Sequence, residues 1–297
     1  MELFRALGVL AERPDATHTK IGAIIGLTGI PDPSTYTDLF SLQLYPYASV
    51  YLGSEGMLGG EARDRVAGFW RALNLVPPAE ADHLATLLSL YAELRERTEE
   101  EAEPARRSAL DRARRALLWE HLLPWVPLYA HKMQAIADDF YGSWASLLES
   151  SLYGEIESDT SARSLPLHLR EALPLADPRK EGAQSFIAAL LAPVRSGLIV
   201  VRSDLARAAC HLGLGLRQGE RRFVLESLFA QDRAGTLAWL ATEARATSMQ
   251  LGNAERLPAA IRHFWKGRSV ETARLLAALR ETMSEFTAAS SPSDAAL

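Results

Sequence analysis

Cysteine is almost absent from this 297-residue chain, because Cys210 is the only one. A single cysteine cannot form an internal disulfide, so nothing in the sequence requires an oxidising compartment. Long apolar runs are also missing, since no stretch approaches the roughly 20 apolar residues of a membrane-spanning helix. The first residues lack the basic start and apolar run of a signal peptide. These absences predict a soluble, cytoplasmic protein.

Common enzyme motifs are absent as well. The sequence has no phosphate-binding loop ending in Gly-Lys-Ser/Thr, no Gly-x-Ser-x-Gly nucleophile elbow and no His-Glu-x-x-His zinc motif. The glycine-rich run at residues 53–60 follows no strand pattern, so we predict a loop between helices. The histidines show no metal-ligand spacing. The sequence therefore predicts a binding protein rather than an enzyme, with no metal and no cofactor.

Charge is unevenly distributed along the chain, whose net charge is −5. Residues 1–180 hold 18 basic and 26 acidic side chains, whereas residues 181–297 hold 14 basic and 11 acidic ones. An acidic N-terminal portion repels nucleic acid and favours basic ligands. Solubility alone would also account for this acidic excess, so the charge leaves both interpretations open.

The dominant sequence period is helical. Apolar residues at 66–73, 84–91 and 275–286 recur with i, i+3, i+4 spacing, which is typical of one face of an α-helix. Alternating strand patterns are scarce. We therefore predict an all-α fold, a helical bundle.

Capping residues predict several helix boundaries. Ser34 can begin a helix that runs to about Leu52 and ends at Gly53, and Ser203 can begin one that Gly213 ends. Asp232 can cap the segment that follows it. Further along, Gly267 is predicted to end one helix and Ser269 to begin the next.

A linker is predicted between Tyr153 and Glu181, where a glycine and three prolines stand among polar residues. This linker divides the chain into a core module of about 1–175 and a helical extension of about 180–287. Residues 288–297 are small and polar and predict a flexible tail. Cys210 lies among apolar residues and is predicted to behave as a small buried hydrophobe.

The run from Pro77 to Leu84 combines helix-breaking prolines with charged groups. Glu80, Asp82 and His83 stand at the first turn of the helix that the 84–91 pattern predicts. Carboxylates are favoured there because they accept hydrogen bonds from free backbone N–H groups. Glu80 or Asp82 could therefore simply cap the helix. Alternatively, the carboxylates and the imidazole stand at the mouth of a groove and meet a cationic peptide.

Four segments of the chain resemble the TorD/DmsD/NarJ family of chaperones, which mature molybdenum-containing redox enzymes. Residues 80–83 are similar to the family's Glu-Pro-(x)-Asp-His signature, and residues 44–53 to its early Tyr-x-x-x-Tyr-Leu helix. His121-Leu-Leu-Pro-Trp125 resembles its His-Leu-x-x-Trp segment, and residues 140–141 its aromatic pair. The chain departs from the pattern at Ala81, where the family has proline, and at Leu87, where it often has a carboxylate.

The resemblance implies a helical bundle of the TorD/DmsD type with an additional C-terminal helical extension. It implies a cytoplasmic chaperone that binds the N-terminal, twin-arginine-type leader of a molybdoenzyme catalytic subunit and assists cofactor insertion before export. The implied peptide-binding residues match the family segments or lie beside them: Asp82, His83, Glu80, Tyr47, Tyr51, His121 and Trp125. Core packing is an alternative for each. Family members can exchange segments between copies, which would permit a homodimer. No nucleic acid and no stable membrane insertion are expected.

Two other functions fit parts of the sequence. Residues 204–223 resemble the spacing of a helix-turn-helix DNA-binding regulator, although the apolar residues at 224–229 favour a core position for the second helix. An all-helical enzyme could use Glu80, Asp82 and His83 as an acid–base set. No nucleophile, metal site or cofactor site accompanies these three residues in the sequence.

Overall fold

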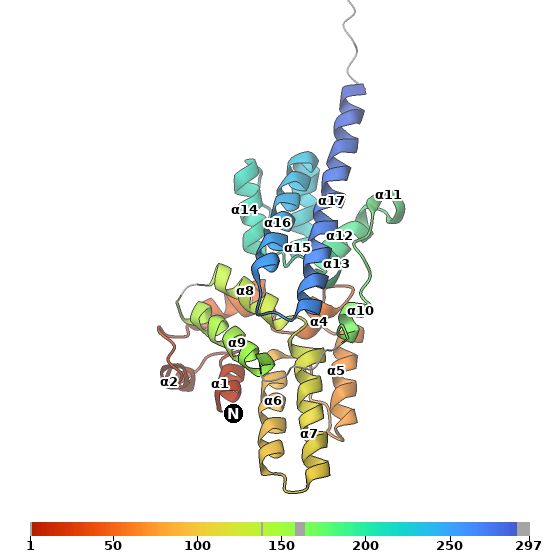
Figure 1. The fold of residues 1–297 in the computed structure, drawn as a ribbon. Helices are drawn as coiled ribbons and strands as arrows, with labels where there is room; N and C mark the ends of the chain where they lie inside the picture. Colours follow the sequence, from red (N-terminus) through yellow and green to blue (C-terminus); the bar gives the residue numbers. More distant parts are fainter. Residues whose placement is uncertain (1, 138, 158–163, 290–297) are drawn as a thin grey trace, which may run out of the picture. The chain divides into compact units, whose positions relative to one another are not determined.

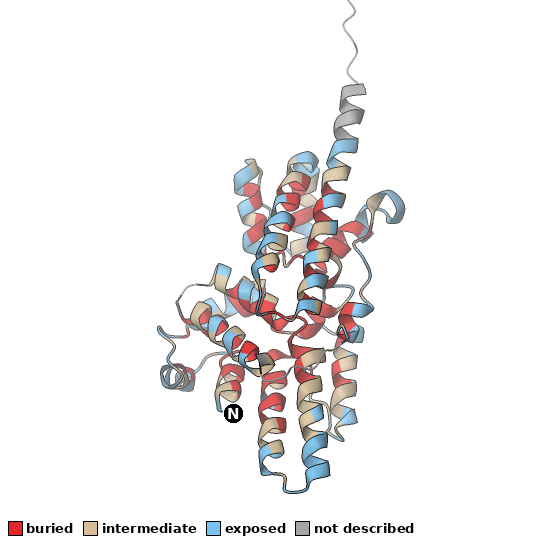
Figure 2. Cartoon of the chain, viewed as in Figure 1, coloured by how far each residue is buried: buried red, intermediate tan, exposed pale blue. Residues whose placement is uncertain are grey.

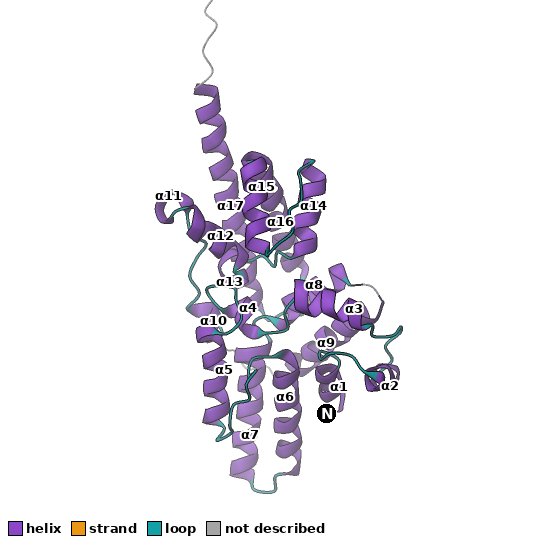
Figure 3. Ribbon diagram, turned by 180° about the vertical axis from the view of Figure 1, so that it is seen from behind, coloured by secondary structure: helices purple, strands orange, loops and turns teal. Residues whose placement is uncertain are grey.

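The structure is a computed structural model that describes residues 2–137, 139–157 and 164–289. Within these ranges every named element is a helix, and the backbone pairing outside helices includes a single isolated bridge between Tyr47 and His83 (Figure 3). The predicted all-α class is thereby confirmed. Most of the predicted tail, residues 290–297, lies outside the described residues.

The described chain divides into two compact units. The first contains the residues up to Ala172 together with Arg256–Ile261, and the second contains Leu173–Glu255 and the residues from Arg262 onward. The helices up to the boundary at Ala172 are labelled in Figure 1 where there is room and have these bounds: α1 (Glu2–Val9), α2 (Ala16–Ile24), α3 (Pro33–Tyr36), η1 (Thr37–Gln43), α4 (Ala48–Leu52), α5 (Gly60–Ala72), α6 (Leu84–Glu100), α7 (Pro104–Ala116), η2 (Leu117–Leu122), α8 (Val126–Ile136), α9 (Asp139–Glu157) and α10 (Leu167–Arg170).

Aromatic side chains form the centre of the first unit, where α1 and α7 pack on α6 and α8 packs on α9. Trp125, Trp144 and Tyr129 are fully buried, and the indole N–H of Trp144 donates to the Leu7 carbonyl at 3.0 Å. A buried indole needs such an acceptor, since an unpaired polar group in a core costs free energy. By contrast, α7 has no buried residue (Figure 2). The charged run that forms α7 therefore covers α6 and faces solvent.

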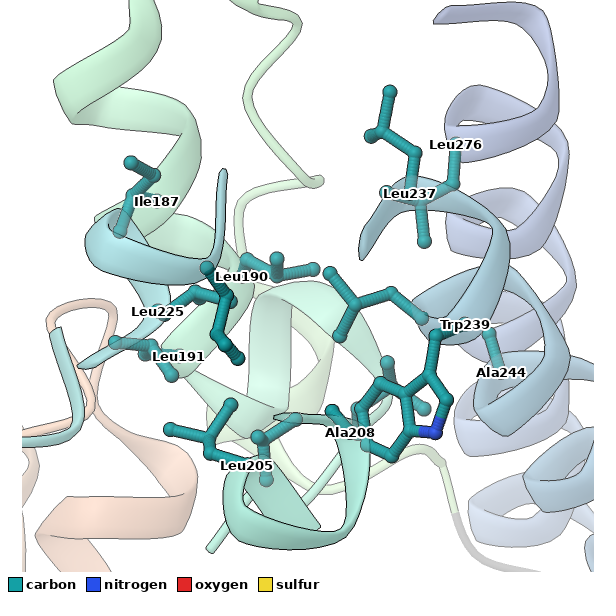
Figure 4. Close-up of a cluster of buried hydrophobic side chains, with 14 of the residues drawn as sticks. Ile187, Leu190, Leu191, Leu205, Ala208, Leu225, Leu237, Trp239, Ala244 and Leu276 are labelled. Carbon is teal, nitrogen blue, oxygen red and sulfur yellow. The ribbon is translucent and has the colours of Figure 1, made fainter. Parts of the chain in front are cut away.

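The second unit has a separate apolar core (Figure 4). Its helices have these bounds: α11 (Pro178–Glu181), α12 (Ala183–Leu191), α13 (Pro193–Ser196), α14 (Arg202–Leu212), α15 (Arg221–Gln231), α16 (Arg233–Asn253) and α17 (Ala259–Ala289), whose residues up to Ile261 belong to the first unit. Val224, Leu225 and Leu228 of α15 are all buried in this core. The apolar face of α15 is thus occupied, which argues against its use as a DNA-recognition helix.

The predicted helix from Ser34 to Leu52 is wrong in two respects. Its first turn is capped by Asp32, whose carboxylate accepts from the Thr35 N–H at 2.8 Å. The helix is then interrupted between η1 and α4, because Pro46 disfavours a helical backbone at Tyr45. Gly53 does end α4, and the glycine-rich run up to Gly60 is the predicted interhelical loop.

Further along, one boundary prediction is confirmed and two are corrected. Asp232 caps α16 as predicted, accepting from the Gly235 N–H at 2.9 Å. At α14 the cap is Val201 rather than Ser203. No break occurs at residues 267–269, because α17 runs through them. The buried hydroxyl of Ser269 instead donates to carbonyls of Trp265 and Gly197, at 2.9 and 3.0 Å.

The prediction of a buried Cys210 is also wrong, because this residue is exposed. The buried side of α14 consists of Asp204, Leu205, Ala208 and Ala209. A residue that directly follows Ala209 is rotated by about 100° around the helix axis, which places it outside that stripe. The apolar residues next to Cys210 in the sequence therefore did not predict the burial of Cys210 itself.

Candidate functional site

Two short backbone segments pair beside the start of α6. The N–H of Leu84 donates to the Pro46 carbonyl at 2.8 Å, and the N–H of Ala48 donates to the Asp82 carbonyl at 3.0 Å. These bonds form the antiparallel bridge between Tyr47 and His83. The bridge brings together the two sequence segments that carry most of the predicted site residues.

Asp82 lies inside this junction and is only 1% exposed. Its carboxylate accepts from the Ser49 N–H at 3.0 Å, at the first turn of α4. The hydroxyl of Ser49 in turn accepts from the Gly59 N–H at 3.1 Å. Asp82 thus holds the start of α4 and, through Ser49, the glycine-rich loop. The Asp82 side chain therefore faces the backbone of α4 rather than solvent.

His83, rather than Glu80 or Asp82, is the N-terminal cap of α6. Its Nδ1 accepts from the Ala85 N–H at 3.2 Å, which assigns the proton of the neutral ring to Nε2. The ring is 8% exposed and packs edge-on against Tyr47, with centroids 4.7 Å apart. Burial lowers the pKa of His83, while nearby Glu80, Glu12 and Asp82 act in the opposite direction. A residue of this run does cap α6, but the capping group is the imidazole of His83 and not a carboxylate.

The exposed side of the junction is acidic and aromatic. Glu80 and Glu12 are exposed, while Tyr36 and Tyr47 are half-buried. Burial raises the pKa of Tyr47, and a hydrogen bond to Glu80 raises it further. The pKa of Tyr36 is raised by burial and then by Glu12 and Glu80, against a smaller effect of Arg13. We call Glu12, Tyr36, Tyr47, Glu80 and His83 the acidic–aromatic patch.

Tyr51, Trp125 and His121 lie in the interior of the first unit. Tyr51 stacks on Trp125 with centroids 5.1 Å apart and donates its hydroxyl to the Tyr45 carbonyl at 2.9 Å. The indole N–H of Trp125 donates to the His121 carbonyl at 2.8 Å. Tyr47 and Tyr51 have different ring partners, because Tyr47 packs against His83 whereas Tyr51 packs against Trp125.

His121 belongs to a second cluster, together with Phe69 of α5 and His168 of α10. The His121 ring lies 5.0 Å from Phe69 and 5.8 Å from His168, between centroids. Among the described residues, Nδ1 of His121 and Nε2 of His168 are buried without a hydrogen-bond partner. Burial, followed by His168, lowers the pKa of His121 to about 3, and burial, followed by Arg65, lowers that of His168 to about 4. Both rings are neutral at pH 7.

The described residues contain no group of three or more His, Cys, Asp or Glu side chains arranged to hold a metal ion. Nor is any described helix both long and apolar enough to cross a membrane. The sequence alone did not indicate four members of these clusters, namely Glu12, Tyr36, Phe69 and His168. Each lies far along the chain from its partners, and no local spacing signals a contact of that kind.

Comparison with known proteins places the acidic–aromatic patch largely within a recognised segment. Residues 34–131 match the family described as nitrate reductase delta subunit. A search of curated proteins finds the chaperone protein TorD of Photobacterium profundum, which is 30% identical over 108 residues. This match covers 35% of the present chain and 50% of the relative, so the chain spans about half the length of that protein. No solved structure matches the chain. On these matches the predicted resemblance is confirmed: residues 34–131, in the first unit, resemble a segment of the TorD/NarJ family.

Proposed function

We propose that this chain is a chaperone for redox-enzyme maturation, acting in the cytoplasm and needing no cofactor of its own. In this proposal it binds the N-terminal, twin-arginine-type leader of a molybdoenzyme catalytic subunit. Binding keeps that subunit from export while its cofactor is inserted. The observation that carries the proposal is the pair of exposed carboxylates, Glu12 and Glu80, beside the tyrosines and His83. Most of this patch lies within the family segment.

The proposed binding residues differ from those that the sequence favours most. Glu80 and Tyr47 offer a carboxylate and a phenol at the surface, where guanidinium groups can form charge-assisted hydrogen bonds. Asp82 has a positioning role in this account, because its carboxylate is occupied by the Ser49 N–H. Tyr51, His121 and Trp125 are buried, so in this account they do not contact the leader through this surface. Glu12 adds a second negative charge that the sequence alone does not reveal.

Exposed apolar side chains stand in the loops that flank the patch. Val76 is 89% exposed and precedes Glu80 in the loop between α5 and α6. Met57 and Leu58, at 66% and 55% exposed, directly precede Gly59, which is bonded to Ser49. Large apolar side chains with this exposure are typical of binding surfaces when they gather beside polar groups. They suit the apolar stretch that follows the arginines of a leader.

Removal of the two exposed carboxylates should weaken capture of a leader peptide. We expect Glu80→Gln and Glu12→Gln each to raise Kd about threefold, since an exposed ion pair contributes about 0.2–1 kcal/mol. The double variant should lose about tenfold in affinity if the two contributions add. Affinity is measured with an immobilised peptide that carries paired arginines followed by an apolar stretch.

The matched control is Glu103→Gln, because Glu103 is exposed and stands at the start of α7. This variant removes the same charge and should leave Kd unchanged. A double variant that binds as tightly as the control would remove the patch from the proposal. Failure of the unmodified chain to capture any arginine-paired peptide would contradict the leader-binding function itself.

A further inference from the structure

The last described residues before the boundary at Ala172 form a short strap over α5 and η2. Residues 164–171 are fastened at three points along their length. The indole N–H of Trp119 donates to the Ser164 carbonyl at 2.9 Å, and the Leu167 N–H donates to the Glu120 carboxylate at 2.8 Å. At the far end, Arg65 and Glu171 form an ion pair. All three contacts lie at the exposed edge of the strap, where water competes for the same groups.

Beneath these contacts, three side chains of the strap are buried. Leu169 is 1% exposed and His168 is 6% exposed, and Pro166 is buried as well. The imidazole of His168 meets that of His121 at a near-right angle. The strap is thus a single turn of helix whose His168 ring packs against His121, and His121 in turn packs against Phe69.

The polar fit beneath the strap is incomplete. Nδ1 of His121 and Nε2 of His168 are both buried without a hydrogen-bond partner, while the neighbouring apolar groups are well packed. A buried polar atom without a partner destabilises the arrangement that buries it. A different segment that packs an apolar residue in place of Leu169 and offers a hydrogen bond to His121 would satisfy this face better than the strap does.

We propose that residues 164–171 are a detachable strap that occupies, in the free chain, a second docking face for the client polypeptide. This inference rests on the proposed chaperone function and identifies a further contact region for the same client. The strap itself shows the chemistry that the face accepts: a short turn with apolar residues three apart, like Pro166 and Leu169, and one hydrogen-bonding side chain between them. Release of the strap exposes His121, Phe69 and the Trp119 side chain to such a segment.

Release of the strap can be measured without any client, by modification of His121 with diethyl pyrocarbonate and mass spectrometry. The double variant Glu120→Ala/Glu171→Ala removes two of the three fastening points. We expect it to raise the rate of His121 modification about tenfold, while exposed His131 reacts at an unchanged rate. The matched control is Glu61→Ala, which removes the other carboxylate partner of Arg65 and leaves the strap contacts in place. The proposal of a detachable strap would be contradicted if the double variant left the rate of His121 modification unchanged. It would also be contradicted if Glu61→Ala raised that rate as much as the double variant does.

Docking is then tested with a strap that is tied down. Cysteines replace Arg65 and Glu171 in a chain whose exposed Cys210 is serine, and a short bis-maleimide with a cleavable disulfide joins them. We expect capture of the client subunit to fall at least tenfold in the joined form and to recover on reduction. Equal capture by the joined and reduced forms would show that the client does not use this face. If neither form nor the unmodified chain captures the subunit, the chaperone proposal fails, and the His121 labelling still decides whether the strap detaches.

Discussion

Lowering the pH from 7 to 5 should destabilise the chain by about 4 kcal/mol through His121 and His168. The pKa of each imidazole is depressed in the folded state, to about 3 and about 4, because burial disfavours the charged ring. In the unfolded state both rings titrate near the ordinary value of about 6.5. Between pH 6.5 and 4 the unfolded state therefore binds more protons, and the free energy of unfolding decreases as the pH falls.

The size of this effect follows from the distance to the unfolded pKa. At pH 5 each ring is still neutral in the folded state. The pH then lies about 1.5 units below the unfolded pKa, so protonation of each ring stabilises the unfolded state by about 2 kcal/mol. Burial also lowers the pKa of His83, which adds a contribution of the same sign. Since folded proteins are stable by only about 5–15 kcal/mol, such a loss is large.

The double variant His121→Leu/His168→Leu should remove most of this pH dependence. Urea unfolding at pH 7 and at pH 5 gives the two free energies that are compared. At pH 7 the variant should be at least as stable as the unmodified chain, because two unpartnered buried nitrogens are replaced by apolar groups. The exposed residue His131 provides the control, since His131→Leu should keep the full loss between the two pH values. If the double variant also shows the full loss in free energy of unfolding between pH 7 and pH 5, the two imidazoles do not cause the pH dependence.

Replacement of Asp82 by alanine should destabilise the first unit by about 2–4 kcal/mol. The carboxylate is buried and accepts from the Ser49 N–H, so alanine leaves that donor without a partner in a dry environment. Asp82→Asn should cost about 1 kcal/mol, because its amide oxygen can accept the same hydrogen bond without the charge. Thermal unfolding followed by near-UV circular dichroism measures both changes.

Leader capture by the same variants separates a positioning role from a direct contact. If Asp82 only positions the junction, Asp82→Asn should weaken capture less than Glu80→Gln does. A direct ion pair to an arginine would reverse that order. Cys210→Ala serves as the reference, because Cys210 is exposed and lies in the second unit.

The helical class and the location of α6 could be predicted because both depend on local patterns. The apolar spacing at 84–91 and the prolines at 77 and 78 define a helix that begins where the structure begins it, at Leu84. The break before α4 could also have been predicted, since Pro46 stands inside the proposed helix. At Ser269 the sequence was misleading. A serine can cap the start of a helix, but it can equally lie inside a helix, as Ser269 does in α17, where it packs against the backbone of Gly197.

The candidate site was less predictable, because its exposed and buried members alternate over a few residues. Glu80 faces solvent while Asp82 is buried, although both are acidic residues at one helix start. The distinction depends on the bridge between Tyr47 and His83, which is a long-range pairing that no periodicity reveals. Glu12 joins the patch for a similar reason, since the loop after α1 reaches it only in the folded unit.

The central claim is that this chain binds the leader of a molybdoenzyme catalytic subunit through the acidic–aromatic patch. The most direct measurement is purification of the chain from its native host, followed by cross-linking and identification of the bound polypeptide. The account predicts a molybdoenzyme catalytic subunit whose N-terminal segment cross-links to residues beside Glu80 and Tyr47. A bound polypeptide of another kind, or cross-links confined to the second unit, would contradict it.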